Sequence, residues 1–172
     1  MIKLNSYLSL IRFYNPIGFW LLLWPGLWGL FLSDNFNIEN FTIVVLGSFL
    51  TRSLGCAIND FLDRDFDKSV ERTKNRPIAS NELSLSEAGI FTILLASVCI
   101  ILLMQTNPYT IKLVSYVAIP MIILYPLMKR FLAMPQLFLG ATFGLSLPIS
   151  YSIAESTLSL EVIFLYLSLI HI

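Results

Sequence analysis

Long runs of apolar residues alternate with short polar segments along the chain. The complete apolar runs cover about residues 14–32, 41–59, 86–104, 111–127 and 134–153, and a further run begins near residue 158. At about 1.5 Å of rise per residue, each complete run is long enough to cross the hydrocarbon core of a bilayer as an α-helix. The pattern therefore predicts an all-α fold, a multi-pass transmembrane helical bundle with about five complete helices and a partial sixth.

Composition supports a membrane protein and excludes other classes. The 172 residues are 56% hydrophobic and only 13% charged, whereas soluble domains carry about 25% charged residues. The formal net charge is zero, so no nucleic-acid partner is expected, and no feature points to a protein partner. Cys56 and Cys99 lie inside apolar runs without metal-binding spacing, so we expect both to be small core residues.

Basic residues alternate between the predicted loops. Lys3 and Arg12 precede the first helix, five Lys and Arg residues lie between the second and third helices, and Lys129 and Arg130 follow the fourth. The loops on the other side carry none. The positive-inside rule therefore predicts a cytoplasmic N-terminus and places both later basic segments on the cytoplasmic side of the membrane.

Half of the charge is concentrated in one short segment. Of the 22 charged residues, 11 lie between Asp60 and Glu82. On a helix with about 100° between residues, an arc of about 100° holds four oxygen-bearing side chains, Asn59, Asp60, Asp63 and Asp67. Asp65 falls outside this arc. If the second helix continues past Asn59, these side chains line one stripe at the membrane boundary.

Such a stripe predicts a cation site. Like charges at helical spacing destabilise a bare helix, and a bound cation would reverse that effect. Oxygen ligands favour Mg²⁺ (or Mn²⁺), which takes one or two carboxylates together with waters and substrate phosphates. Nearby cations suited to phosphate oxygens are Arg72, Lys74, Arg76, Lys129 and Arg130. Together they predict diphosphate chemistry, in which the metal neutralises the leaving group and apolar helices hold a hydrocarbon tail.

Other interpretations of these residues stay open. The charged segment can be a solvated loop that simply obeys the topology rule, and Arg52, inside the second predicted helix, can snorkel or pair with an acid. An ion transporter also carries intramembrane acids, more often near the bilayer midplane. A CDP-alcohol phosphatidyltransferase is Asp-rich too, but its D-G-x-x-A-R signature is missing.

Several motifs in order carry a family resemblance. Residues 59–67 read Asn-Asp-Phe-Leu-Asp-Arg-Asp-Phe-Asp, and residues 71–77 read Glu-Arg-Thr-Lys-Asn-Arg-Pro. Residues 12–18 read Arg-Phe-Tyr-Asn-Pro-Ile-Gly, and residues 125–130 read Tyr-Pro-Leu-Met-Lys-Arg. Over about residues 8–155, the chain resembles the intramembrane aromatic prenyltransferases (the UbiA superfamily), and within them the bacterial 4-hydroxybenzoate polyprenyltransferases.

The resemblance implies a reaction and a site. The reaction is transfer of a polyprenyl group from polyprenyl diphosphate to the ring of 4-hydroxybenzoate, ortho to the hydroxyl, for ubiquinone biosynthesis at the bacterial inner membrane. Asn59, Asp60, Asp63 and Asp67 would bind Mg²⁺–diphosphate, with Asp63 and Asp67 catalytic. Arg72, Arg76, Lys129 and Arg130 would hold phosphate oxygens. Arg12 and Arg52 would contact the aromatic carboxylate or line its pocket. Haem, homogentisate or a naphthoate are alternative acceptors.

Part of the family pattern lies outside this sequence. The family uses two aspartate-rich motifs in a bundle of about nine helices, but here every Asp lies at or before Asp67 and the later Glu residues form no acidic pair. Leu167–Ile172 reads as the translation of a transposon-based library adapter. We therefore expect residues 1–166 to be the N-terminal part of a membrane prenyltransferase domain and residues 167–172 to be a non-native tail. An inert gene remnant is the alternative.

Overall fold

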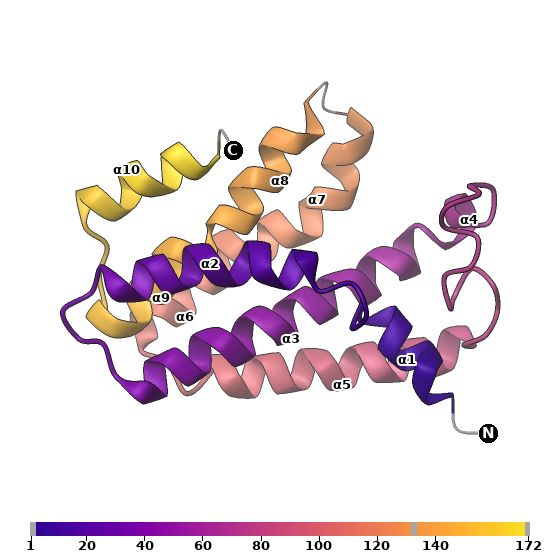
Figure 1. Ribbon diagram of the computed structural model, residues 1–172, viewed down its shortest axis with the longest axis horizontal. Helices are drawn as coiled ribbons and strands as arrows, with labels where there is room; N and C mark the ends of the chain where they lie inside the picture. Colours follow the sequence, from indigo (N-terminus) through magenta and orange to yellow (C-terminus); the bar gives the residue numbers. More distant parts are fainter. Residues whose placement is uncertain (1–2, 132–133, 171–172) are drawn as a thin grey trace. The chain divides into compact units, whose positions relative to one another are not determined.

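The computed structural model describes residues 3–131 and 134–170, and this part of the chain contains helices and no strand (Figure 1). The elements are α1 (Leu4–Leu10), α2 (Ile17–Phe31), α3 (Ile38–Leu62), α4 (Arg64–Asp67), α5 (Leu85–Leu103), α6 (Pro108–Leu113), the π-helical turn η1 (Val114–Ala118), α7 (Ile119–Phe131), α8 (Pro135–Gly144), α9 (Ser146–Glu155) and α10 (Leu160–Leu169). The all-α prediction is confirmed.

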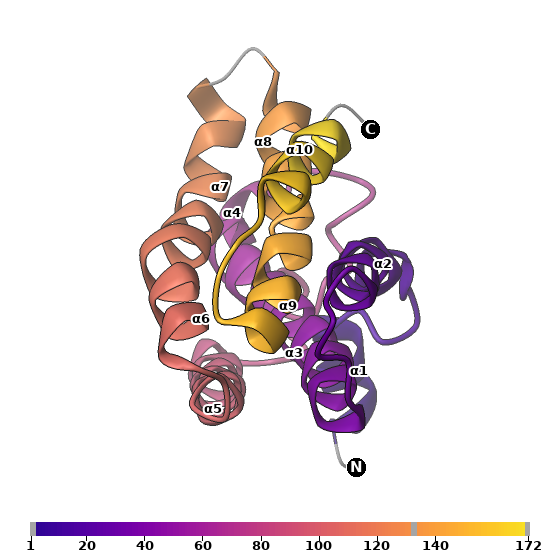
Figure 2. The same cartoon turned by 90° about the vertical axis from the view of Figure 1, so that its left-hand side faces the viewer.

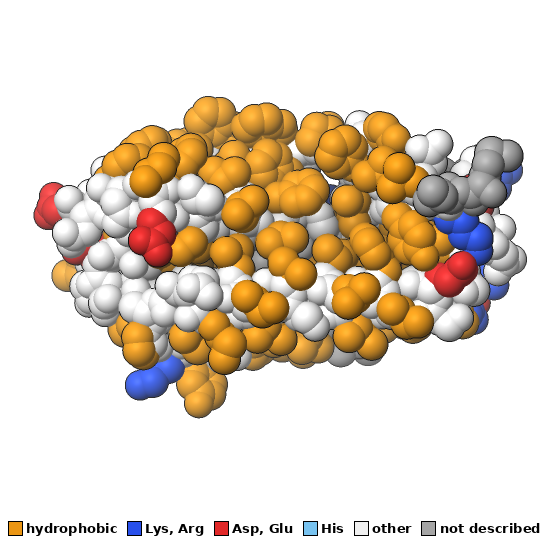
Figure 3. All heavy atoms as spheres, turned by 90° about the horizontal axis from the view of Figure 1, so that it is seen from below, with side chains coloured by type: hydrophobic (Ala, Val, Ile, Leu, Met, Phe, Trp, Pro, Cys, Tyr) orange, Lys and Arg blue, Asp and Glu red, His pale blue; other side chains and the backbone are white. Residues whose placement is uncertain are grey.

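Among the described residues, four helical stretches are long and apolar enough to cross a membrane. They cover Ile38–Leu62, Leu85–Leu103, Pro108–Tyr125 and Gln136–Glu155. Helices α2 and α10 are apolar but shorter. Hydrophobic side chains cover much of the surface shown in Figure 3, and few charged side chains lie among them. An apolar surface of this extent suits contact with lipid.

Helix α2 begins three residues later than the apolar pattern predicted. Its first residue, Ile17, directly follows Pro16, and a proline disfavours helical backbone in the residue before it. The tryptophans of α2 are about half exposed: Trp20, Trp24 and Trp28. Such exposure suits tryptophans that anchor a helix at the membrane interface.

Two predicted spans are interrupted next to prolines. The π-helical turn η1 divides the fourth predicted helix into α6 and α7, and Pro120 follows it closely. The fifth predicted helix is divided into α8 and α9 at Leu145, three residues before Pro148. Proline has no N–H to donate to the preceding turn, so the regular α-helical hydrogen bonding changes at both places.

The chain forms two compact units, and the first consists of Met1–Gly18 and Leu50–Ile100. The buried residues at its core are Leu10, Ala57, Ile78, Leu83 and Ala88. The rings of Tyr7 and Phe91 pack against this core, with their centroids 4.9 Å apart. This core joins α1 to α3, to α5 and to the loop that follows α4.

Polar contacts also hold α1 to the start of α5. The Nζ atom of Lys3 lies 2.8 Å from Oε1 of Glu87, and Ser6 Oγ donates a hydrogen bond to Glu82. The backbone N–H of Ser84 donates to Glu87 Oε2 (2.9 Å), and that of Glu87 donates to Ser84 Oγ (3.3 Å). This capping box starts α5 and places the carboxylate that receives Lys3.

In the second unit, Phe19–Phe49 and Ile101–Ile172, α2 and α9 approach each other closely. A Cβ atom at Gly29 of α2 would overlap the carbonyl oxygen of Leu147 and Oγ of Ser150, both on α9. Ser150 Oγ donates to the Gly26 carbonyl at 2.5 Å. In Figure 2, α10 lies against α8 and α9, which it also contacts.

Candidate functional site

The predicted acidic stripe lies where α3 gives way to α4. Asp63 separates the two helices, with φ −92° and ψ 5°. Hydrogen bonds of α-helical spacing nevertheless continue, because the Asp63 N–H donates to the Asn59 carbonyl (2.9 Å) and the Asp67 N–H donates to the Asp63 carbonyl (2.8 Å). The stripe therefore follows a broken helical path, whereas the sequence argument assumed a continuous one.

Burial separates the aspartates of this segment. The exposed fractions of Asp60, Asp63 and Asp67 are 1%, 7% and 6%. Asp65 is exposed, and its Oδ1 lies 3.1 Å from Nε of Arg64. The hydrogen bond from Arg64 lowers the pKa of Asp65 below its ordinary value. The three buried carboxylates are those that the helical projection placed on one stripe.

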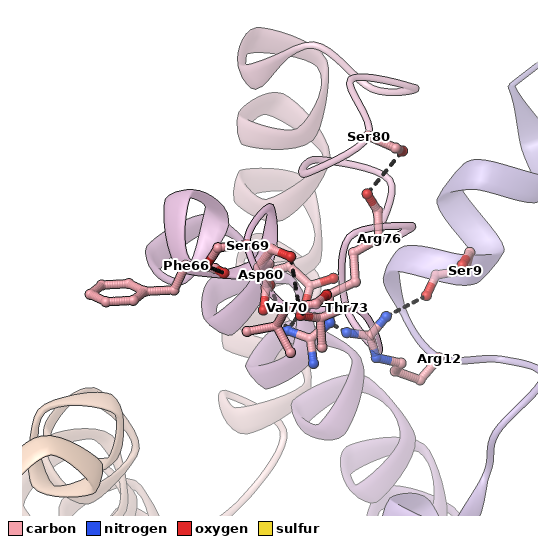
Figure 4. Close-up of polar contacts among 10 residues, drawn as sticks. Ser9, Arg12, Asp60, Phe66, Ser69, Val70, Thr73, Arg76 and Ser80 are labelled. Carbon is pink, nitrogen blue, oxygen red and sulfur yellow. Dashed lines mark hydrogen bonds and ion pairs between the residues drawn. The ribbon is translucent and has the colours of Figure 1, made fainter.

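Asp60 is held by two arginines from different parts of the chain (Figure 4). Nη2 of Arg12 donates to Oδ1 of Asp60 at 2.6 Å, and Nη1 of Arg76 lies 3.2 Å from the same oxygen. The other oxygen, Oδ2, is buried without a hydrogen-bond partner among the described residues. Two cations thus balance one enclosed carboxylate, which unpaired would be costly to bury.

Arg76 joins this pair to a second buried carboxylate. Its Nη1 donates to Oδ2 of Asp67 at 2.7 Å. Thr73 Oγ1 donates to the backbone carbonyl of Asp67 at 3.3 Å and so fixes the loop beside it. Arg12, Asp60, Asp67 and Arg76 form one network of two cations and two anions, named here the acid–arginine cluster.

Arg12 adopts an unusual backbone conformation. Its φ is +58°, in the left-handed region that non-glycine residues seldom enter. Its side chain also donates from Nη1 to the carbonyl of Ser9 at 3.3 Å. Strained residues of this kind occur at functional sites, where surrounding contacts hold them. Here the ion pair with Asp60 is such a contact.

Arg52 lies over the start of α2. A Cβ atom at Gly18 would overlap Nε of Arg52 and would lie 2.6 Å from both Cζ and Nη2. The guanidinium of Arg52 therefore occupies the space that a side chain at Gly18 would fill. Only glycine at this position allows that placement, which the sequence alone did not reveal.

The structure brings some predicted site residues together and leaves others apart. Arg12, Asp60, Asp67 and Arg76 share direct contacts. Asp63 is also buried and lies between Asp60 and Asp67 in the sequence, whereas Arg72 is exposed. Lys129 and Arg130 fall within the bounds of α7, and their side chains lie outside the described part of the structure. Sequence reasoning missed Ser9 and Thr73, which make local hydrogen bonds with Arg12 and with the Asp67 carbonyl. It also missed the approach of Arg52 to Gly18, because nothing in the local pattern indicates a partner on another helix.

The cluster alone is not a complete metal cage. Within the described residues, no group of three His, Cys, Asp or Glu side chains could hold a metal ion. Mg²⁺ normally needs only one or two carboxylates, because waters and substrate phosphates complete its coordination. Asp63 and Asp67, buried just beyond the end of α3, could supply those one or two carboxylates.

The chain belongs to the UbiA prenyltransferase family, whose family model matches residues 22–172. Curated relatives carry the name 4-hydroxybenzoate octaprenyltransferase. The protein of that name from Polynucleobacter asymbioticus is 43% identical over 161 residues, which are 92% of this chain and 56% of the relative. The one from Vibrio atlanticus is 41% identical, over 95% of this chain and 58% of the relative. The chain thus spans little more than half the length of these relatives.

Solved structures show the same fold. A digeranylgeranylglyceryl phosphate synthase matches 99% of this chain and 59% of its own length, with a TM-score of 0.81 and 24% identity. A UbiA homologue from Archaeoglobus fulgidus, bound to GPP and Mg²⁺, matches 96% of this chain and 58% of its own length, with a TM-score of 0.74 and 20% identity. The family and the resemblance expected from the motifs are confirmed, and the chain is an integral membrane protein.

Proposed function

We propose that the protein containing this chain transfers a polyprenyl group from polyprenyl diphosphate to the ring of 4-hydroxybenzoate, ortho to the hydroxyl, in ubiquinone biosynthesis. The main structural support for this function is the set of buried carboxylates and arginines at the end of α3, a helix long enough to cross a membrane. The names of the curated relatives support the reaction. The A. fulgidus homologue, with its bound GPP and Mg²⁺, supports the donor class.

Asn59, Asp63 and Asp67 are the side chains of this segment that would hold Mg²⁺ together with the diphosphate. When bound, the ion would neutralise negative charge on the departing diphosphate. Arg76 already contacts Asp67, so its guanidinium is next to the position where phosphate oxygens would arrive. Arginine forks suit such oxygens. Further phosphate contacts are proposed for Arg72, Lys129 and Arg130.

Arg12 and Arg52 are the proposed contacts for the carboxylate of the aromatic acceptor or for the wall of its pocket. Both guanidiniums have fixed positions, Arg12 through Asp60 and Arg52 in the space beside Gly18. The apolar helices would surround the prenyl chain and keep water from an allylic cation. The C–O bond to diphosphate breaks to give that cation, the ring carbon ortho to the hydroxyl then forms a bond to the prenyl C1, and the ring loses a proton.

The positions of the acids favour this reaction over ion transport. Transporters place intramembrane acids near the middle of the bilayer, often on interrupted helices. Asp60 lies two residues before the end of α3, and Asp63 and Asp67 lie beyond that end. The same positions, with the basic residues nearby, support a cytoplasmic location of the segment in a bacterial inner membrane.

The test is Asp63→Ala in the complete protein, assayed in membranes with Mg²⁺, polyprenyl diphosphate and 4-hydroxybenzoate. We expect loss of turnover by about 100-fold or more, because charge stabilisation of the leaving group is removed. Asp65→Ala is the matched control and should keep activity, since Asp65 is exposed. Wild-type membranes that prenylate no hydroxybenzoate, or an Asp63→Ala variant with full turnover, would contradict the proposal.

A further inference from the structure

We propose that Asp60 is a positioning residue that orients Arg76 toward the diphosphate and Arg12 toward the aromatic carboxylate, and that it does not bind the metal. The inference rests on the proposed function and assigns one carboxylate of the acidic stripe a different task from Asp63 and Asp67. Figure 4 shows the guanidinium of Arg12 and the side chain of Arg76 meeting at Asp60.

The surroundings of Asp60 suit arginines better than a hydrated metal. Both guanidiniums approach Oδ1, at 2.6 Å and 3.2 Å. The free oxygen, Oδ2, is completely enclosed, and the whole residue is 1% exposed. Mg²⁺ keeps waters and substrate phosphates in its coordination shell, and an enclosed oxygen leaves no room for them. Asp60 is thus sealed on the side where a metal would need space.

The arginines remain partly open. The side chains of Arg12 and Arg76 are 21% and 22% exposed, although their shared partner is buried. A guanidinium has five N–H donors, and Asp60 and Ser9 together receive only some of those on Arg12. The remaining donors on each arginine are available for an anion. The ion pairs therefore fix each guanidinium without using all of its donors.

The backbone of Arg12 supports a positioning role. A residue at φ +58° is strained unless it is glycine, so arginine at this position is held against its own preference. The ion pair with Asp60 spans 48 residues of sequence and supplies that restraint. A glycine would remove the strain but would also remove the cation.

A purely structural role explains Asp60 less well. Helix α1 is already attached to the same unit by Lys3–Glu87, by Ser6–Glu82 and by its buried Leu10. An additional buried ion pair is not needed to hold the helix in place, and replacing such pairs with apolar residues is often neutral for stability. What Asp60 adds is a defined direction for two guanidiniums.

The experiment compares Asp60→Asn with Asp63→Asn in the complete protein, with exposed Asp65→Asn as the matched control. Mn²⁺ binding is measured by electron paramagnetic resonance, and KM is measured for polyprenyl diphosphate and for 4-hydroxybenzoate. We expect Asp60→Asn to raise each KM by about tenfold or more and to keep Mn²⁺ affinity within about twofold, because guanidinium contacts to phosphate and carboxylate oxygens are strong and directional. Asp63→Asn should weaken Mn²⁺ binding, and the control should change none of these quantities.

A double-mutant cycle separates positioning from general structural damage. If Asp60 acts through Arg76, Asp60→Asn should add little to the KM for polyprenyl diphosphate of an Arg76→Lys variant, because coupled residues are not additive. Full additivity would overturn the proposal, as would Mn²⁺ affinity lost equally in Asp60→Asn and Asp63→Asn. If Asp60→Asn does not fold, the test rests on Arg12→Lys and Arg76→Lys. An unchanged KM for both substrates in both variants would then refute the inference. Inactive wild-type protein would instead refute the proposed function.

Discussion

At the scale of single residues, the absence of a side chain at Gly18 has a clear structural effect. The guanidinium of Arg52 occupies that space. Because the overlapping atoms are the far end of a flexible side chain, a methyl group at this position would displace the guanidinium without moving backbone. Gly18 and Arg52 therefore form a pair that a single small substitution can separate.

We predict that Gly18→Ala raises KM for the aromatic acid by about tenfold, because one hydrogen bond from a charged group is lost. KM for polyprenyl diphosphate should stay nearly unchanged. Steady-state kinetics with each substrate varied in turn would measure both values. Gly55→Ala is the matched control, because a Cβ atom there meets nothing within 4 Å. Equal changes in both KM values for Gly18→Ala would contradict the assignment of Arg52 to the acceptor.

At the scale of helices, the close approach of α2 to α9 is a tightly packed contact of the second unit. The atoms that a methyl group at Gly29 would meet include the backbone oxygen of Leu147, and backbone on a packed helix has little freedom to move. Small residues allow such approaches in membranes, where van der Waals packing and hydrogen bonds hold helices together. Ser150, which donates to the Gly26 carbonyl, adds one of these bonds.

Gly29→Ala is expected to destabilise the protein by about 2 kcal/mol or more, since overpacking forces helices apart. Thermal unfolding in detergent, followed by tryptophan fluorescence, would measure the loss. Gly47→Ala provides the comparison, because the nearest atom to its Cβ would be Leu102 Cδ2, at an ordinary 3.7 Å. A Gly29→Ala protein as stable as the Gly47→Ala protein would show that α2 and α9 are not closely packed.

At the scale of the whole molecule, the apolar pattern predicted the helices well and their interruptions poorly. Hydrophobic runs report where a helix can cross lipid, and the membrane-length stretches of the structure agree with them. The breaks at η1 and Leu145 depend on how each chain segment re-forms its hydrogen bonds near proline, which periodicity does not report. The site was likewise predicted in part. Helical projection correctly grouped the buried aspartates, but it could not predict the Arg12–Asp60 ion pair, which joins segments far apart in the sequence.

Topology can be tested on the whole chain by cysteine labelling. With Cys56 and Cys99 replaced by alanine, Ser80→Cys should react with a membrane-impermeant maleimide only from the cytoplasmic side. Asp34→Cys should react only from the opposite side, because α3 crosses the membrane between them and the basic loops stay inside. Both positions are exposed. Labelling of both from the same side would contradict the predicted orientation.

The acid–arginine cluster also constrains the order of events during synthesis. Arg12 leaves the ribosome early, and its partner Asp60 follows only after α2 and nearly all of α3 have been made. Arg76, the second partner, follows later still. Because chains emerge from the N-terminus onward, the nascent Arg12 must wait in water or at the lipid headgroups while two hydrophobic helices enter the bilayer. Closure of the cluster must therefore wait until Arg76 has been made, and the first unit is completed later still, when α5 follows.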